Sequence, residues 1–239
     1  MKVPKELIEE IKSSDGHLYK LHIPKTKEGK DRKNEVIQVL KELECENIIH
    51  VGACGHLKGI QRQLEKGTWF HAKLCSNFKN VIGTDINGQA IEYLVNQGKK
   101  RLYNKDVIID SEMLKNEIER KKAEGSKNAI LLPEVLEHIE EPYIFLRNLK
   151  ENYKGYYIVI TVPNAFGTWV FFDILRHNYE RINSDHKYWF TPFTLLKIAI
   201  LSGVEIEELR FCDYSITGKI LKKPIIANTL LLIGRLGQE

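Results

Sequence analysis

The sequence predicts a doubly wound α/β fold, with a mainly parallel seven-stranded sheet, an antiparallel edge strand and helices on both faces. Five short apolar runs alternate with segments of helical periodicity, which is typical of parallel strands joined by crossover helices. Each run ends in a glycine-bearing or polar turn, and right-handed crossovers bring such turns to one edge of the sheet. Two later apolar runs suit strands that pair antiparallel. The seven runs are 48–51, 81–86, 101–109, 129–132, 156–162, 204–214 and 225–233.

Helices are expected between these strands, where apolar residues recur every three or four positions. Ser111 suits a helix N-cap and Pro142 a first helical turn. Gly98, Gly125 and Gly203 stand where helices would end. The predicted helices span 31–43, 68–78, 89–95, 111–124, 140–152 and 191–201.

The length of 239 residues suits one large domain. Residues 1–30 are polar and interrupted by proline and glycine, so we expect an N-terminal extension rather than core. Residues 31–239 should form the domain, with a helical insertion at about 165–190 on the substrate side.

Composition excludes several classes of protein. The net charge of +4 is spread without a long single-sign block, so no nucleic-acid partner is indicated. The four cysteines are far apart, which argues against a zinc module or a disulfide scaffold and fits a reducing compartment. No signal peptide or membrane span is recognisable, so a cytoplasmic location is expected. The sequence leaves the oligomeric state open.

The first two turns have the features of a nucleotide-type site. Small residues in the turn 51–56 let a ligand approach the backbone closely, although the spacing is not G-x-G-x-x-G. Asp85 ends the second strand, where a carboxylate can accept both hydroxyls of a ribose. The gap between these turns is longer than usual, so we expect an extended loop at 57–67 that folds over the ligand. His56, Trp69 and His71 would then lie near it.

The third and fourth turns add acids and an imidazole. Asp106, or alternatively Asp110, follows the third run and could read an adenine amino group. Glu134, Glu137 and His138 fall within one helical turn after the fourth run. They suit acid–base chemistry, a divalent cation, or support of the next helix. No other local histidine completes a closed site, so a metal is not favoured.

Taken in order, these motifs resemble a class I S-adenosylmethionine-dependent methyltransferase, whose fold is Rossmann-like. The resemblance covers about 48–212 and is strongest for the branch with an E-x-x-E-H motif. That branch includes ubiquinone-biosynthesis and glycan-pathway methyltransferases. The motifs are Val51-Gly-Ala-Cys-Gly, Val81-Ile-Gly-Thr-Asp-Ile-Asn, Leu132-Pro-Glu-Val-Leu-Glu-His-Ile, Thr161-Val-Pro-Asn and Asp185-His-Lys-Tyr-Trp-Phe-Thr-Pro.

The resemblance implies S-adenosylmethionine as cofactor and S-adenosylhomocysteine as product. Residues 52–56 (Gly52, Ala53, Cys54, Gly55 and His56) would line the methionine part. Asp85 would bind the ribose, and Ile86 would pack on the adenine. The adenine edge would be read by Asp106 and Val107, and the sulfonium would be bordered by Leu132, Pro133 and Glu134.

The chain departs from the family in two places. The family loop reads D-x-G-x-G-x-G, whereas here His50 replaces the acid, Cys54 the middle glycine and His56 the last. RNA 3′-end methyltransferases of a related branch carry E-x-x-E-H-H, whereas Ile139 stands at the second histidine position. That RNA function is therefore not supported.

The acceptor is expected to be a small molecule or a sugar, methylated on oxygen or nitrogen. His138 is the first candidate for the base, Glu134 the second, and Glu137 belongs to the same group. Aromatic residues crowd the segment after Asn164, either as an aromatic lid or as the core of the insertion. Two other functions stay open: a non-catalytic binding protein of the same fold, and a nicotinamide-dependent oxidoreductase.

Overall fold

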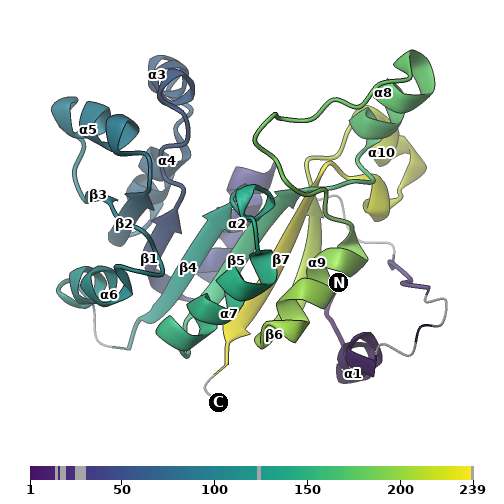
Figure 1. The fold of residues 1–239 in the computed structure, drawn as a ribbon, viewed down its shortest axis with the longest axis horizontal. Coiled ribbons are helices and arrows are strands. Elements are labelled where there is room, and N and C mark those ends of the chain that lie inside the picture. The colour runs from purple at the N-terminus through teal and green to yellow at the C-terminus, as the bar shows by residue number, and fades with distance from the viewer. Residues whose placement is uncertain (14–15, 17–19, 25–30, 123–124, 238–239) are drawn as a thin grey trace.

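The computed structural model describes residues 1–13, 16, 20–24, 31–122 and 125–237, which form one seven-stranded sheet with the order β3-β2-β1-β4-β5-β7-β6 (Figure 1). β1 to β5 pair in parallel, and β7 pairs antiparallel with both β5 and the edge strand β6. The predicted mixed sheet is confirmed. The strands are β1 (Cys45–Val51), β2 (Asn80–Asp85), β3 (Leu102–Asn104), β4 (Lys127–Pro133), β5 (Tyr157–Pro163), β6 (Val204–Cys212) and β7 (Thr229–Leu236).

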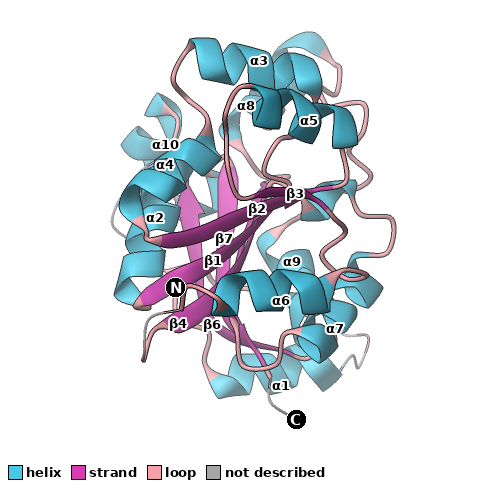
Figure 2. Cartoon of the chain, turned by 90° about the vertical axis from the view of Figure 1, so that its left-hand side faces the viewer, coloured by secondary structure: helices cyan, strands magenta, loops and turns pink. Residues whose placement is uncertain are grey.

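Helices cover both faces of this sheet (Figure 2). α6 (Ser111–Glu119), α7 (Pro142–Asn152) and α9 (Pro192–Leu201) pack on one face, and α2 (Arg32–Glu42) and α4 (Phe70–Asn77) on the other. α3 (Leu57–Glu65) and α5 (Gly88–Asn96) share a third, smaller core near β2 and β3. The remaining elements are α1 (Lys5–Ser13), η1 (Leu136–His138), α8 (Thr168–His177), α10 (Ile216–Leu221) and η2 (Pro224–Ile226).

Local sequence explains the most regular of these elements. β4 and β5 are buried on both faces, so their side chains form continuous apolar runs rather than an alternating pattern. The Asp31 side chain accepts bonds from the backbone N–H groups of Lys33 and Asn34 and so caps α2. Thr191 and Thr194 form a capping box at the start of α9.

The segment 101–109 is a shorter strand than predicted. Only Leu102–Asn104 pairs with β2, and a turn follows. Asp106 causes this turn, because its carboxylate accepts the backbone N–H groups of Ile108 and Ile109. The next helix begins at Ser111, so Asp110 rather than Ser111 stands at the N-cap, without a side-chain capping bond. That helix ends at Glu119, and the predicted last residue, Glu124, lies outside the described residues.

The segment 57–67, predicted as an extended loop, is mostly the helix α3. Leu57, Ile60 and Leu64 lie four or three residues apart, and Ile60 is fully buried against the small core. The helix predicted at about 68–78 is present as α4.

Part of the predicted N-terminal extension belongs to the core. Val3 and Ile11 are buried in the main apolar cluster. The amino group of Met1 donates to the carbonyl of Leu209, and the Val3 N–H donates to Glu207, so residues 1–3 lie along β6. Residues 14–15, 17–19 and 25–30 of this segment lie outside the described residues.

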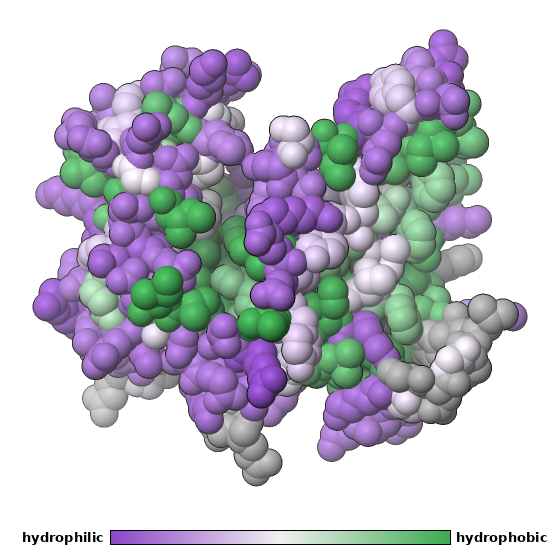
Figure 3. Space-filling view, in the orientation of Figure 1, coloured by the Kyte–Doolittle hydropathy of each residue, from purple (hydrophilic) through white to green (hydrophobic). Residues whose placement is uncertain are grey.

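The surface is hollowed between the lobe of α3 and α5 and the lobe of α8 (Figure 3). This hollow lies above the carboxyl ends of the central strands. In the described part of the chain, no helix is both long and apolar enough to span a membrane. All four cysteines are free thiols, and only Cys75 is exposed.

Candidate functional site

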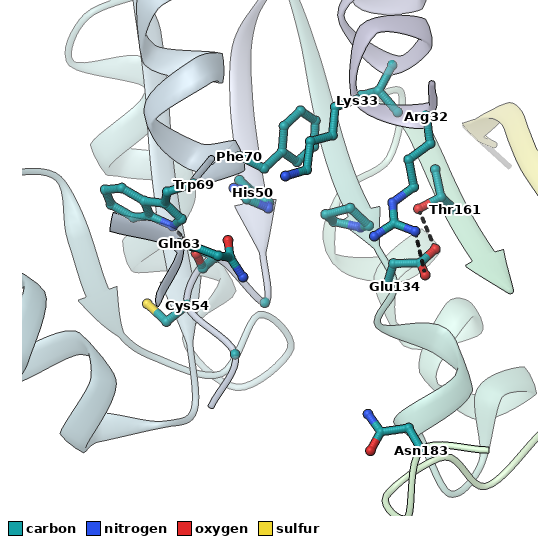
Figure 4. Close-up of a pocket in the computed structure, with 15 residues that line it drawn as sticks. Arg32, Lys33, His50, Cys54, Gln63, Trp69, Phe70, Glu134, Thr161 and Asn183 are labelled. Carbon is teal, nitrogen blue, oxygen red and sulfur yellow. Dashed lines mark hydrogen bonds and ion pairs between the residues drawn. The ribbon is translucent and has the colours of Figure 1, made fainter. Parts of the chain in front are cut away.

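A cavity of about 330 Å³ opens at the carboxyl ends of β1, β4 and β5 (Figure 4). The turn 52–55 forms one wall, and Pro133, Glu134 and Thr161 form the opposite wall. Arg32 and Lys33 reach into it from the start of α2. The cavity therefore lies at the edge that the sequence predicts, and its size is in the range of small-molecule sites.

The glycine turn is shaped by two left-handed residues. Gly52 has φ +69° and Gly55 has φ +63°, a region that favours glycine. A Cβ on Gly52 would lie 2.7 Å from Cγ2 of Val135, whereas a Cβ on Gly55 would meet nothing within 4 Å. Gly52 is thus required both by backbone conformation and by close packing. The Cys54 side chain is buried, and burial raises the pKa of its thiol to about 12.

Asp85 holds this turn in place. One carboxylate oxygen accepts the N–H groups of Cys54 and Gly55 at 2.9 and 3.0 Å. The other oxygen accepts the N–H of Asn87 at 2.9 Å, at the start of α5. Asp85 is buried, with 8% of its surface exposed. Sequence spacing found this residue but not its backbone partners.

Glu134 stands at the end of β4 in a left-handed conformation, with φ +56°. Its carboxylate accepts the Thr161 hydroxyl at 3.1 Å and pairs with the Arg32 guanidinium at 3.2 Å. Burial raises the pKa of Glu134, although Arg32 opposes this shift. A non-glycine residue held in this backbone region is common at functional sites.

Sequence analysis missed Arg32 and Lys33. Arg32 is fixed by Asp213, whose carboxylate accepts the Arg32 N–H at 2.9 Å and lies 3.8 Å from its guanidinium. Two cations in the first turn of a helix oppose the helix dipole. That unfavourable placement was the signal in the sequence that could have identified them.

His50 and His71 form a buried pair beside the cavity. Their Nδ1 atoms are 3.1 Å apart and their rings stack at 5.3 Å. Each has 2% of its surface exposed. Burial lowers the pKa of both, that of His71 to about 4 with a further contribution from Arg101. His50 lines the cavity, whereas His71 lies behind it.

Four further residues of the predicted cofactor site differ in exposure. Ile86 has 78% of its surface exposed, next to the turn that Asp85 holds. Asp106 uses one carboxylate oxygen in its own turn, and Val107 is buried. Leu132 is fully buried, so its side chain belongs to the core and does not line the cavity.

Glu137, His138 and His186 form a second group of titratable side chains. One possible ligand atom from each lies within 4.8 Å of the others. Glu137 is fully buried, and neither carboxylate oxygen has a hydrogen-bond partner among the described residues. Burial and, next, Glu134 raise the pKa of Glu137 to about 8. The sequence motif that begins at Asp185 includes His186, but its place beside Glu137 was not predicted, because it lies 48 residues from His138 and reaches the group only through folding.

Asp185 connects this group to the glycine turn. One of its carboxylate oxygens lies 2.9 Å from Nε2 of His56 and 3.2 Å from Nδ1 of His138. His56 is the residue before α3, so the contact joins the start of α3 to the segment between α8 and α9. His56 does not line the cavity and instead contacts Asp185.

The aromatic segment after Asn164 is mixed in character. Phe190 is buried, whereas Phe171, Phe172, Tyr179 and Tyr188 are exposed. α8 is the helix of the predicted insertion, and Asn183 from this segment lines the cavity.

Comparisons with known proteins identify the fold. No family model and no curated protein matches the chain. Solved structures that match include a SAM-dependent methyltransferase from Archaeoglobus fulgidus, with 17% identity, a TM-score of 0.51 and coverage of 85% of this chain and 94% of that one. The methyltransferase domain of a bacterial Hen1 protein matches with 16% identity, a TM-score of 0.54 and coverage of 86% and 97%. The small RNA methyltransferase HEN1 matches with 17% identity, a TM-score of 0.56 and coverage of 85% and 24%. The chain thus has the fold of class I S-adenosylmethionine-dependent methyltransferases.

Proposed function

We propose that this chain is an S-adenosylmethionine-dependent methyltransferase of the E-x-x-E-H branch, which acts on a small-molecule or glycan-type hydroxyl or amine. The cavity between the left-handed glycine turn and Glu134, in a methyltransferase fold, is the observation that carries the proposal. In that cavity the turn 52–55 faces the methionine part of the cofactor. Arg32 and Lys33 supply positive charge for its carboxylate.

The nucleoside part extends past Asp85 towards Ile86, which offers an exposed apolar surface to the adenine. Asp106 and Val107 border the adenine edge, and Pro133 and Glu134 the sulfonium. The cofactor supplies an activated methyl group, so the protein has mainly to align the acceptor behind it. His138 is the proposed base, because Glu134 is already paired with Arg32 and Thr161.

Binding of S-adenosylhomocysteine tests this function directly. We expect the folded protein to bind it in isothermal titration calorimetry. Gly52→Ala should weaken binding about tenfold or more, because its Cβ would force Val135 and the turn to move.

Gly67→Ala is the matched control. Gly67 has a similar φ of +63°, and its Cβ would meet nothing within 4 Å. Like Gly52→Ala, this variant should be destabilised by about 1 kcal/mol through backbone strain. Unlike Gly52→Ala, it should bind S-adenosylhomocysteine with the affinity of the wild type. No binding by the wild-type protein at millimolar ligand would refute the proposal and favour a non-catalytic protein of this fold.

Fluorescence titration with NADH tests the oxidoreductase alternative.

We further infer that Glu137, His138 and His186 hold a divalent transition-metal ion next to the acceptor. Two imidazoles and one carboxylate are a common ligand set for such ions. The Glu137 carboxyl is buried, has no hydrogen bond among the described residues and lies 4.0 Å from Nε2 of His186. With its pKa raised to about 8 it holds a proton at neutral pH, and a bound cation would displace that proton and pair with the carboxylate. A bound ion would occupy a ring nitrogen of His138, so the ion would then replace His138 as the group that activates the acceptor, by lowering the pKa of an acceptor hydroxyl.

This group also favours a second acceptor class, the ribose hydroxyl of an RNA end. The sequence argument against it rested on Ile139, but His186 brings a second imidazole beside Glu137 and His138. Two structural neighbours are Hen1 proteins, one of them a small RNA methyltransferase. The test compares methyl transfer to an RNA with free hydroxyls on its terminal ribose and to the same RNA with these hydroxyls blocked. Transfer to the free RNA alone would support this acceptor over a small molecule.

Metal binding gives a further prediction. We expect Mn²⁺ or Zn²⁺ to bind with one-to-one stoichiometry and to raise the melting temperature. Glu137→Gln and His186→Gln should each weaken binding about tenfold or more. His177→Gln, which removes an exposed histidine on α8, should bind like the wild type. Equal affinity in all four proteins would contradict the assignment.

A further inference from the structure

A second cavity, of about 440 Å³, lies alongside α4. It lies between this helix, the start of β2 and the segment that leads into β3, so it is near the amino ends of these two strands rather than their carboxyl ends. Five cationic side chains line it: Lys79, Lys99, Lys100, Arg101 and Lys121. None of the proposed cofactor chemistry uses these residues.

The positive charge in this cavity is not neutralised by the described residues. No carboxylate of the described chain lines it, and no ion pair between described residues includes any of its four lysines. Arg101 donates to two neutral acceptors, the side-chain oxygen of Asn80 and the carbonyl of Glu117. Converging charges of one sign in a concave surface raise the local concentration of counter-ions, so the cavity attracts anions.

His71 lies in the same wall and supplies an independent observation. It is buried, and its Nε2 has no hydrogen-bond partner among the described residues. A buried polar nitrogen without a partner costs about 1–3 kcal/mol, and such atoms are rare in native structures. In the tautomer with a proton on Nε2, His71 is a donor for an anion.

The partition between this cavity and the cofactor cavity is thin. Trp69 lines both, and its indole N–H donates to the carbonyl of Ala53 in the glycine turn at 2.8 Å. His71 contacts His50, and His50 lines the cofactor cavity. A change of tautomer at His71 therefore changes the hydrogen bond between His71 and His50, and with it the protonated nitrogen of a residue that lines the cofactor cavity.

We propose that the cavity beside α4 binds a phosphorylated small molecule and that its occupancy is communicated to the cofactor cavity through His71 and His50. A phosphate group fits better than a carboxylate because it brings more than one negative charge and three acceptor oxygens to five cations. The anion holds the His71 proton on Nε2, so Nδ1 of His71 accepts and Nδ1 of His50 donates. The communication, but not the binding, rests on the proposed function.

Inorganic pyrophosphate is the probe for binding, titrated by calorimetry at low salt without cofactor. We expect one site, and Lys99→Glu with Lys100→Glu should weaken it about tenfold or more. Lys222→Glu with Lys223→Glu makes the same charge change at another exposed lysine pair. That control should leave the affinity unchanged. No binding by the wild type, or equal loss in both double variants, would overturn the proposal. The proposal would also be overturned if a short single-stranded RNA bound through both lysine pairs while pyrophosphate did not bind.

The communication is read from the imidazole nitrogens by NMR of protein labelled with ¹⁵N-histidine. Pyrophosphate should shift the ring nitrogens of both His71 and His50, and it should change the affinity for S-adenosylhomocysteine several-fold. In His71→Gln the His50 response and the affinity change should be lost. Unchanged His50 nitrogens in a wild-type protein saturated with pyrophosphate would refute the coupling. Failure of S-adenosylhomocysteine to bind would refute the proposed function and leave the pyrophosphate titration as a separate result.

Discussion

Asp85→Ala should lower the melting temperature by roughly 6–12 °C and weaken S-adenosylhomocysteine binding about 100-fold or more. The substitution removes the acceptor of three backbone N–H groups, those of Cys54, Gly55 and Asn87. Buried donors left without a partner cost about 1–3 kcal/mol each, and water compensates part of that, so about 3 kcal/mol is expected in total. The glycine turn would also lose the contact that fixes its shape.

Asp85→Asn is the matched variant, because it keeps one side-chain oxygen. That oxygen can still accept either from Cys54 and Gly55 or from Asn87, but not from all three. Asp85→Asn should fall between the wild type and Asp85→Ala in both thermal denaturation and calorimetry. A variant Asp85→Ala with wild-type stability and affinity would mean that the turn holds itself and that Asp85 does not contact the ribose. That outcome would favour a non-catalytic protein of this fold.

Much of the fold could be predicted from local pattern. The continuous apolar runs of β4 and β5 and the capped starts of α2 and α9 all carry their signals within about ten residues of sequence. The predictions were wrong where contacts with distant or turn-forming residues determine the structure. The segment 101–109 is apolar enough for a long strand, but Asp106 bends it into a turn. Val3 and Ile11 are buried only because residues 1–13 pack beside β6 and α9.

The candidate site was predictable where a residue directly follows a strand, and unpredictable where partners come from elsewhere in the chain. Glu134, Glu137 and His138 follow β4, but Arg32 approaches Glu134 from a helix about 100 residues earlier. His186 reaches Glu137 from the segment between α8 and α9. The same limit applies to His50 and His71, whose contact across 21 residues no local pattern indicates.

The unfolding free energy should fall as the pH decreases from about 6.5 to about 4, and His71 should account for about 3 kcal/mol of that loss. Burial lowers the pKa of His71 in the folded protein to about 4, below its value of 6.5 in the unfolded chain. A depressed histidine pKa means that the unfolded chain binds the proton more tightly. The stabilisation is therefore complete above pH 6.5 and is lost as the pH falls towards 4.

Chemical denaturation of the wild type and of His71→Gln at several pH values measures this loss. The stability difference at pH 7.5, where His71 is neutral, is the baseline for the effect of the substitution itself. Between pH 6.5 and 4 the wild type should lose more stability than His71→Gln, and the gap should change by about 3 kcal/mol. Parallel curves would show that His71 accepts a proton in the folded protein as readily as in the unfolded chain. The pair with His50 would then open readily, because burial and Arg101 both oppose a charge at His71.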